Sequence, residues 1–281
     1  MKVKITADST CDLSPELIAK YDIDIIPLSV TLGDQTYLDG VELAPDAIYT
    51  YVEQSGVLPK SSAVNIEEYD RVFRRWTGEG YAVVHFGISS GFSCSCQNAT
   101  IAAQEVENVF VVDSRNLSTG QGLLVLRGAE LAAEGLDAET ICRRCAEDAA
   151  KVEASFVVDS IDYLYKGGRC SPLAAFGANL LKIKPCIEVK NGVMEPSKKY
   201  RGPIEKVILQ YVTDRLSARE DLDPARIFIT HTRCDPECVR QVEQTIRAVA
   251  PGFREILETT AGSTITTHCG PNTLGVLFFR K

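Results

Sequence analysis

Residues 81–89, YAVVHFGIS, form the clearest buried-strand pattern in the first half of the chain, and a second apolar run, NVFVVDS, follows at 108–114. Between them, SCSCQNATIAAQEV at 93–106 has the length and composition of a helix. A strand, a helix and a strand in this order are typical of a βαβ unit, whose two strands lie parallel in one sheet. The stretch therefore predicts an α/β fold.

The same alternation extends outward from this unit. VKITAD at 3–8 and IDIIPLSVTL at 23–32 are predicted strands, the second with an edge or a bulge at Pro27, which cannot donate to a ladder. Asn65, with Glu68 three residues later, is expected to cap a helix. Further helices are expected after Ser14-Pro15 and over residues 119–135 and 137–151. A mostly parallel sheet is predicted for this half.

After about residue 152 the pattern changes. Residues 184–202, KPCIEVKNGVMEPSKKYRG, predict a β-hairpin, because Asn191-Gly192 supplies the positive φ angles of a type I′ turn. A helix opened by Asp235-Pro236 and further strands follow. These mixed elements predict an α+β second domain with antiparallel pairing. We expect two domains, residues 1–155 and 156–281.

Composition restricts the class of protein. The chain has 281 residues, 45% hydrophobic and 24% charged, as in ordinary globular proteins, and a net charge of −8. That charge opposes non-specific nucleic-acid binding, which needs clustered Lys and Arg. The N-terminus has no apolar segment of the kind found in secretory signals, and no run approaches the roughly 18 apolar residues of a spanning helix. We expect a cytoplasmic protein with at most transient membrane contact.

The ten cysteines are interpreted mainly as reduced thiols, because no export signal precedes them. Cys142 and Cys145 are three residues apart and are expected to share a helix face, where a free thiol packs as a small apolar group. The spacing of His231, Cys234 and Cys238 leaves a metal or redox protein as an alternative. No metal site is predicted.

Four short polar clusters are each expected at a strand end or in a loop or Gly-bearing turn. Ser93 is expected to begin a helix, where free N–H groups and a partial positive charge favour an anion. Together the clusters offer hydroxyls, helix-start amides, arginines and one imidazole, which suits a single carboxylate or phosphate. The clusters are KSSAVN at 60–65, GISSGFSCS at 87–95, YKGGRCS at 165–171 and TTHCGPN at 266–272.

A Ser/His hydrolase or transferase acting on an acyl substrate is the alternative. Ser93 and His268 with Asp8, Asp113 or Asp159 would give the residue types of a triad, which is recognised by geometry rather than by order. GISSGFS does not match the nucleophile-elbow pattern, and the sequence contains no Walker-A or dinucleotide-binding motif. The residues favour a binding protein over an enzyme.

Seven motifs, taken in order, make the chain resemble the DegV family of bacterial proteins over nearly its whole length. The motifs are ADSTCDLSPEL, PLSV, ISSGFSCSCQNA, VVDSRNLSTGQG, LYKGGRCS, LKIKPCIEV and THCGPNTLGVLFF. The resemblance implies two α/β domains with a ligand cleft between them. It also implies a long-chain fatty acid as ligand, no cofactor, and a role as the binding subunit of a fatty acid kinase. In that role the protein delivers the acid to a separate ATP-using subunit, which makes the acyl-phosphate.

The resemblance also assigns residues. It places the carboxylate on Ser61, Ser62, Ser93 and His268, and it places two cations near the cleft or the partner, Arg169 and Arg201. The apolar stretch SPLAAFGANLLK offers three candidates for lining a tunnel, or for ordinary core: Phe176, Leu180 and Leu181. The chain departs from the usual family motifs, with KSSAVN for KTSQPS, SSGFSCS for SSGLSGT and THCGPN for THTGPG. Because the hydroxyls and the imidazole are retained, carboxylate binding is expected to persist.

Overall fold

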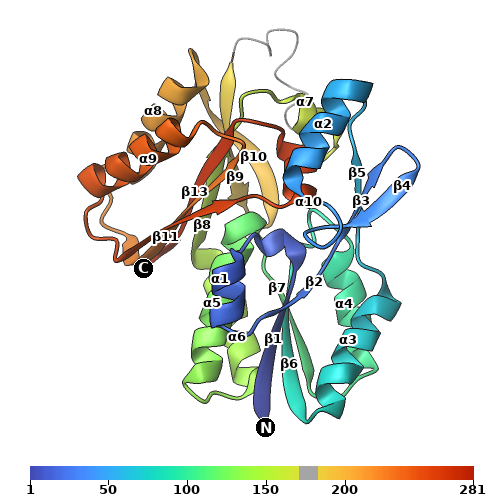
Figure 1. The fold of residues 1–281 in the computed structure, drawn as a ribbon. Coiled ribbons are helices and arrows are strands. Elements are labelled where there is room, and N and C mark those ends of the chain that lie inside the picture. The colour runs from blue at the N-terminus through green and yellow to red at the C-terminus, as the bar shows by residue number, and fades with distance from the viewer. Residues whose placement is uncertain (171–182) are drawn as a thin grey trace.

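The computed structural model describes residues 1–170 and 183–281. An N-terminal part and a C-terminal part, each built on its own sheet, lie next to one another, with a small third sheet beside the junction (Figure 1). The predicted fold class is confirmed, with a parallel sheet in the N-terminal part and a mixed sheet in the C-terminal part. The predicted domain boundary at 155/156 falls inside a strand of the second sheet.

The N-terminal sheet has the strand order β2-β1-β6-β7, and all its pairings are parallel. Its strands are β1 (Lys2–Asp8), β2 (Asp24–Ile26), β6 (Tyr81–Gly87) and β7 (Val109–Asp113). The strand-helix-strand stretch that predicted the fold is therefore β6, α4 (Ser95–Gln104) and β7. Parallel strands place their carboxyl ends at one edge of the sheet, and the site lies beyond that edge.

Helices cover both faces of this sheet (Figure 1). Val83 packs in a cluster with side chains of α3 (Ile66–Gly78) and α4, and Val84 packs on the opposite face with α5 (Ser118–Ala133) and α6 (Ala138–Asp148). Neighbouring residues on a strand point to opposite faces, so an uninterrupted apolar run such as AVV is what a sheet buried on both sides requires. The short helix α1 (Pro15–Lys20) begins at the predicted Ser14 cap, which accepts the N–H of Leu17.

The prediction of a single strand over residues 23–32 is wrong, because the chain leaves the parallel sheet after Ile26. Pro27 and Leu28 lead into β3 (Ser29–Leu32), which pairs antiparallel with β4 (Gln35–Leu38) and β5 (Lys60–Ser62) in the small sheet. The KSS segment, predicted as a loop, is thus a strand. Helix α2 (Pro45–Ser55) connects β4 to β5.

The C-terminal sheet has the strand order β10-β9-β8-β13-β11-β12. Among its pairings, β11 with β12 is parallel and the other four are antiparallel. Its strands are β8 (Val152–Val157), β9 (Lys184–Lys190), β10 (Val193–Tyr200), β11 (Leu222–Thr232), β12 (Glu255–Thr260) and β13 (Thr273–Arg280). The predicted hairpin is confirmed, with Asn191 at φ 52° and Gly192 at φ 83° between β9 and β10.

Helices α8 (Ile204–Leu216) and α9 (Pro236–Val249) pack together on one side of this sheet (Figure 1). Two short helices, α7 (Asp162–Lys166) and α10 (Ser263–Cys269), lie at the junction with the N-terminal part. None of the helices in the described ranges has the length and apolarity needed for a membrane span.

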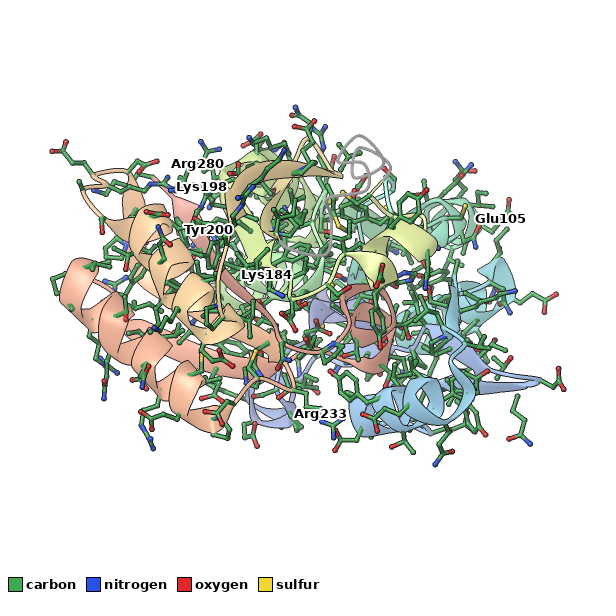
Figure 2. All side chains as sticks on the ribbon, turned by 90° about the horizontal axis from the view of Figure 1, so that it is seen from above. Glu105, Lys184, Lys198, Tyr200, Arg233 and Arg280 are labelled. Carbon is green, nitrogen blue, oxygen red and sulfur yellow. The ribbon has the colours of Figure 1, made fainter. Side chains whose placement is uncertain are left out.

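Polar contacts join the two parts around this junction. The hydroxyl of Ser89 donates to the carbonyl oxygen of Gly192 at the hairpin tip, at 2.7 Å. At another edge, Arg233, labelled in Figure 2, forms an ion pair with Glu53 of α2 at 3.2 Å. The candidate site lies at this junction and is lined by residues of both parts.

Candidate functional site

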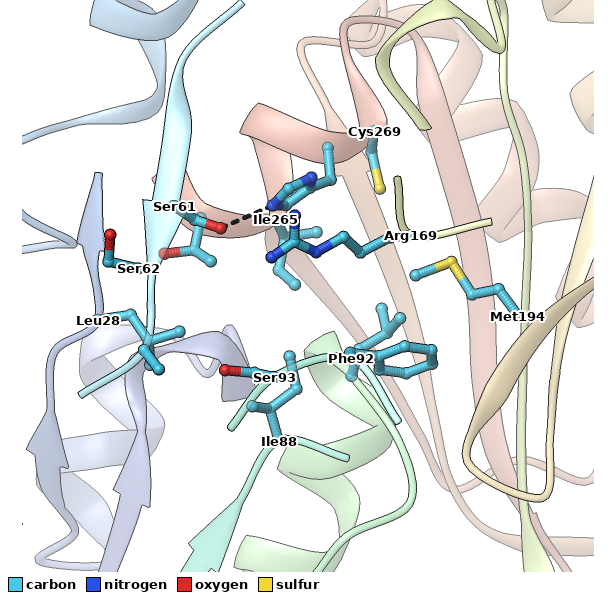
Figure 3. A pocket seen from close by; sticks show the side chains of 14 residues that line it. Leu28, Ser61, Ser62, Ile88, Phe92, Ser93, Arg169, Met194, Ile265 and Cys269 are labelled. Carbon is cyan, nitrogen blue, oxygen red and sulfur yellow. Dashed lines mark hydrogen bonds between the residues drawn. The ribbon is translucent and has the colours of Figure 1, made fainter. Parts of the chain in front are cut away.

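A cavity lies between the two parts, and it contains about 490 Å³ of empty space, solvent at its mouth included. Side chains from both parts surround it (Figure 3). It is lined by Leu28, Ser61, Ser62, Ala63, Ile88, Phe92, Ser93, Leu117, Arg169, Met194, Thr264, Ile265, His268 and Cys269. Most of these side chains are apolar, and hydroxyls, an imidazole and a guanidinium are added to them. Such a lining is typical of a site for an apolar ligand with one polar end.

Ser61 and His268 meet across the junction. Ser61 Oγ on β5 lies 2.7 Å from His268 Nε2 on α10, although 207 residues separate them in the chain (Figure 3). Burial lowers the pKa of His268 to about 4, and the positive charge of Arg169 contributes in the same direction. His268 is therefore neutral at pH 7, and its Nε2 can either accept from Ser61 or donate to its oxygen, depending on the tautomer.

Arg169 supplies the positive charge that the neutral imidazole does not. It follows α7, lines the cavity and donates one guanidinium N–H to the carbonyl oxygen of Gly167 at 2.8 Å. A Cβ on Gly167 would lie 2.6 Å from His268 Nδ1, so this position requires glycine for the imidazole to pack there. A guanidinium has five N–H donors, which leaves several for an anion in the cavity.

Ser93 lines the cavity, but the prediction that it begins a helix is wrong. Helix α4 begins at Ser95 with Cys94 as its N-cap, and Ser93 Oγ accepts the N–H of Ser95 at 3.2 Å. Its hydroxyl also lies 3.0 Å from Ser95 Oγ. The preceding turn is held by buried Asp8, which accepts the N–H of Ile88 at 2.9 Å. Ser93 thus sits at the carboxyl edge of the parallel sheet, next to the first amide of α4.

Of the other predicted site residues that the structure describes, only Ser62 lines the cavity. Ser62 lines the cavity and is exposed at the end of β5. Arg201 is exposed after β10 and is not among the residues that line the cavity. The candidate tunnel residues Phe176, Leu180 and Leu181 lie outside the described residues.

The sequence analysis did not identify the apolar residues that line the cavity, nor the cavity-lining residues of α10 other than His268. Thr264, Ile265, His268 and Cys269 all line the cavity, at spacings of one, four and five residues. Residues at i, i+1, i+4 and i+5 share one side of a helix, so the spacing was a usable signal once TITTHC was taken as helical. A second cavity of about 330 Å³ adjoins the first, since Leu117, Ile265 and Cys269 line both.

The geometry does not assemble the triad considered as an alternative. His268 bonds to Ser61 rather than to Ser93, and its Nδ1 has no hydrogen-bond partner among the residues described. Asp8 accepts from Tyr69 and the backbone, Asp113 accepts from Ser90, and Asp159 pairs with Lys184. A general base needs a carboxylate or carbonyl to orient it, and this neutral imidazole has none in the described part of the chain.

The ten cysteines are all free thiols in the structure. In the ranges 1–170 and 183–281, no group of His, Cys, Asp or Glu has the arrangement of a metal site. Burial raises the pKa of the thiols of Cys11, Cys145 and Cys234, for example, to about 12. Cys145 and Cys142 both belong to α6; Cys145 is part of a buried core cluster and Cys142 packs against the same cluster, as the shared helix face predicts.

The comparisons with known proteins agree with this architecture. The family model described as "Uncharacterised protein, DegV family" matches residues 2–281. A fatty acid-binding protein of Thermotoga maritima is 33% identical over 284 residues, which cover 98% of this chain and 96% of that protein.

Two solved structures are similar over the whole fold. A DegV family protein from Thermus thermophilus, described by its fatty acid binding, superposes with a TM-score of 0.88 at 30% identity and covers 100% of both chains. A stearic acid-binding protein from Eubacterium ventriosum has a TM-score of 0.84 at 29% identity, covering 99% of this chain and 98% of that one. Because the family model and these relatives span essentially the full length, the chain belongs to the DegV family.

Proposed function

We propose that the protein binds one long-chain fatty acid, with the carboxylate in the cavity between the two parts and the acyl chain against its apolar wall. The carboxylate would be held by Ser61, Ser62, Ser93 and His268, with Arg169 supplying the compensating charge. No cofactor takes part in this proposal. The observation that carries it is that Ser61, His268 and Arg169 line the same cavity, most of whose other side chains are apolar.

The energetics favour such a ligand. Removing a methylene group from water contributes about 0.8 kcal/mol, so a long acyl chain supplies most of the binding free energy. A buried carboxylate without partners would cost far more than one hydrogen bond, and for that reason the head needs hydroxyl donors and a cation. The similar protein from Thermus thermophilus is described by its fatty acid binding and that from Eubacterium ventriosum by stearic acid binding, and both support the same ligand class.

The proposal includes delivery of the bound acid to a separate ATP-using kinase subunit, which phosphorylates the carboxylate to an acyl-phosphate. The sequence contains no Walker-A loop that could cradle the phosphates of ATP. Exposed Arg201 and the cavity-facing Arg169 are the cations that we assign to the partner contact and to the carboxylate region. The three candidate tunnel residues, Phe176, Leu180 and Leu181, stay part of the proposal, as does a cytoplasmic, bacterial setting.

Native mass spectrometry of the protein purified from cells, followed by organic extraction, tests the ligand. One co-purifying long-chain fatty acid per chain is expected, and delipidated protein should take up labelled fatty acid at micromolar concentration. Delipidated, folded protein that takes up none would contradict the proposal.

The division of labour is tested with ATP. Scrupulously pure protein, given ATP and fatty acid, is expected to make no acyl-phosphate, and a cognate kinase subunit should restore its formation. ATP consumption by the protein alone would instead favour an enzyme. Turnover of an activated acyl ester that is lost in Ser93→Ala would favour the hydrolase or transferase.

A further inference from the structure

The two ring nitrogens of His268 have different surroundings. Nε2 lies 2.7 Å from the hydroxyl oxygen of Ser61, which can serve as its donor or as its acceptor. Nδ1 is buried and has no hydrogen-bond partner among the residues that the structure describes. Because burial lowers the pKa of His268 to about 4, the ring is neutral at pH 7 and carries its one N–H on one of these two nitrogens. The position of that proton decides which way the Ser61 hydroxyl points.

The groups around Nδ1 favour a lone pair there over a proton. The backbone of Gly167 packs so close that a Cβ on this residue would lie 2.6 Å from Nδ1. Arg169 donates to the carbonyl oxygen of Gly167 at 2.8 Å, so its positive charge lies on this side of the ring. A guanidinium carries donors only and can therefore pair with a lone pair but never with an N–H. The carbonyl oxygen of Tyr163 lies nearby, but it accepts the N–H of Gly167 at 2.8 Å and has no hydrogen bond to the ring.

A proton on Nδ1 would thus be a buried donor without an acceptor, whereas a proton on Nε2 has the oxygen of Ser61. With the proton on Nε2, the imidazole donates and Ser61 accepts. The hydroxyl of Ser61 then cannot give its own proton to the ring, because Nε2 has no free lone pair. Ser61 lines the cavity, so its proton is available to an acceptor held there. A carboxylate accepts only, and it matches this direction.

We infer that His268 is a positioning residue: its Nε2–H donates to Ser61 and turns the Ser61 hydroxyl toward the ligand, so that Ser61 rather than the imidazole contacts the carboxylate. The inference rests on the proposed function for the identity of the acceptor, whereas the protonated nitrogen is a property of the protein alone. A Ser/His hydrolase or transferase needs the opposite direction, in which the serine gives its proton to the imidazole.

Nitrogen-15 NMR of the delipidated protein at pH 7 shows which ring nitrogen is protonated, because protonated and unprotonated imidazole nitrogens resonate at well-separated positions. His268→Gln removes the signals of this ring and so assigns them. The proton is expected on Nε2, and Nδ1 is expected to be unprotonated. A proton on Nδ1 would overturn the inference, whether or not any fatty acid binds.

The role of this donor is tested by titrating delipidated proteins with hexadecanoic acid and with the alcohol of equal length. His268→Gln keeps an N–H donor near the position of Nε2 and should keep the wild-type ratio of acid to alcohol affinity. His268→Leu has no donor and should lower that ratio about three- to tenfold, the range of one neutral hydrogen bond. In a Ser61→Ala background His268→Leu should lower it no further, because the imidazole acts through Ser61. Thr267→Val, on the same helix but not lining the cavity, is the matched control and should keep the ratio.

Two results of these titrations would overturn the inference. Losses that add up in the double variant would mean that His268 contacts the carboxylate itself. Equal losses in His268→Gln and His268→Leu would mean that the N–H donor is not what matters. Melting temperatures show which variants are folded. Wild type that binds no acid would instead refute the proposed function and leave the protonated nitrogen to be judged by NMR alone.

Discussion

The backbone N–H of Gly262 donates to Oδ1 of Asp12 at 2.9 Å, across 250 residues of sequence. Beside it, the N–H of Ser263 donates to Oδ1 of Asp39 at 2.8 Å. Both acidic side chains belong to the N-terminal part, and both amides lie at the start of α10, the helix that bears His268. The N-terminal part therefore fixes the start of the helix whose other end contacts Ser61.

The first prediction concerns Asp12, whose pKa burial raises to about 8, with Asp39 adding in the same direction against the hydrogen bonds from Ser118 and Gly262. The folded protein therefore keeps a proton on Asp12 that the unfolded chain loses near pH 4. The stability that this proton contributes is complete below about pH 4 and is lost as the pH rises to about 8, by at most about 1.4 kcal/mol per pH unit.

Asp12→Asn has no such proton, so its stability relative to wild type should improve steadily from pH 5 to pH 8. Urea unfolding of both proteins at several pH values measures this. A difference that is independent of pH would show that Asp12 is ionised at neutral pH.

The second prediction concerns Gly91 at the hairpin contact. A Cβ on Gly91 would lie 2.4 Å from the carbonyl oxygen of Gly192, so Gly91→Ala must displace the hairpin tip and weaken the bond from Ser89. Overpacking of this kind costs about 1–3 kcal/mol, and the lower urea midpoint would report it. Gly78→Ala, where a Cβ meets nothing within 4 Å, is the control and should not lower the midpoint. Equal midpoints for the two variants would mean that the contact is absent in solution.

The third prediction separates the ligand-binding role of Ser93 from a structural one. Ser93→Ala should weaken binding of a fatty acid by roughly ten- to hundredfold, the range of a hydrogen bond to a charged group. The fatty alcohol of equal chain length carries no charge, so its binding should change far less. Titrations of wild type and variant with both ligands measure this. Equal losses for acid and alcohol would reduce Ser93 to a support for Ser95 and the start of α4.

The fourth prediction concerns the protonation of His268. Because its pKa lies near 4 in the folded protein, its imidazole should show no titration between pH 8 and pH 5 in NMR spectra of the delipidated protein. The unfolded chain protonates near pH 6.5, so the stability contributed by the neutral ring is present above that pH and is lost as the pH falls toward 4.

A bound carboxylate should raise the pKa of His268, and the matching alcohol should not, because only the acid brings a negative charge to the ring. His268→Gln assigns the resonance. The same variant should cost less in fatty acid binding than Ser93→Ala but more in acyl-phosphate production with the kinase subunit. An imidazole that titrates near pH 6.5 without ligand would contradict the buried position.

The fifth prediction concerns the ten cysteines. Cys94 is exposed and Cys142 half-buried, whereas the others are buried. A thiol reagent should label Cys94 first in the native protein, since thiolates react and buried thiols ionise poorly. After anaerobic lysis into denaturant, all ten thiols should react. A count of eight or fewer reactive thiols per chain would instead support a metal site or a disulfide.

Elements with their own local signals could be predicted from the sequence. The Asn191-Gly192 hairpin and the Asn65 cap of α3, which accepts the N–H of Glu68 at 2.8 Å, depend on neighbouring residues alone and are confirmed. The break after Ile26 was missed because Pro27 is compatible with a bulge, an edge or a strand end. Only the separate sheet that β3 joins distinguishes these possibilities.

The sequence predicted which types of residue line the cavity, but not how those residues are arranged in it. Ser61, Ser93, Arg169 and His268 were expected together, and all line one cavity. Thr264 was missed because α10 has no local signal: its N-cap, Gly262, offers no side chain. Asp12 and Asp39, more than 200 residues away, satisfy the first amides of α10 instead.

The three bonds Ser89–Gly192, Ser61–His268 and Asp12–Gly262 span 103, 207 and 250 residues. Contacts so distant in sequence form late, because the chain must lose the entropy of large loops before they repay it. During synthesis the N-terminal sheet can assemble long before residue 268 leaves the ribosome, yet the cavity is complete only once α10 has joined it. On the proposed function, a chain that ends before α10 would hold no acyl ligand, because His268 and the other cavity residues of that helix would be missing.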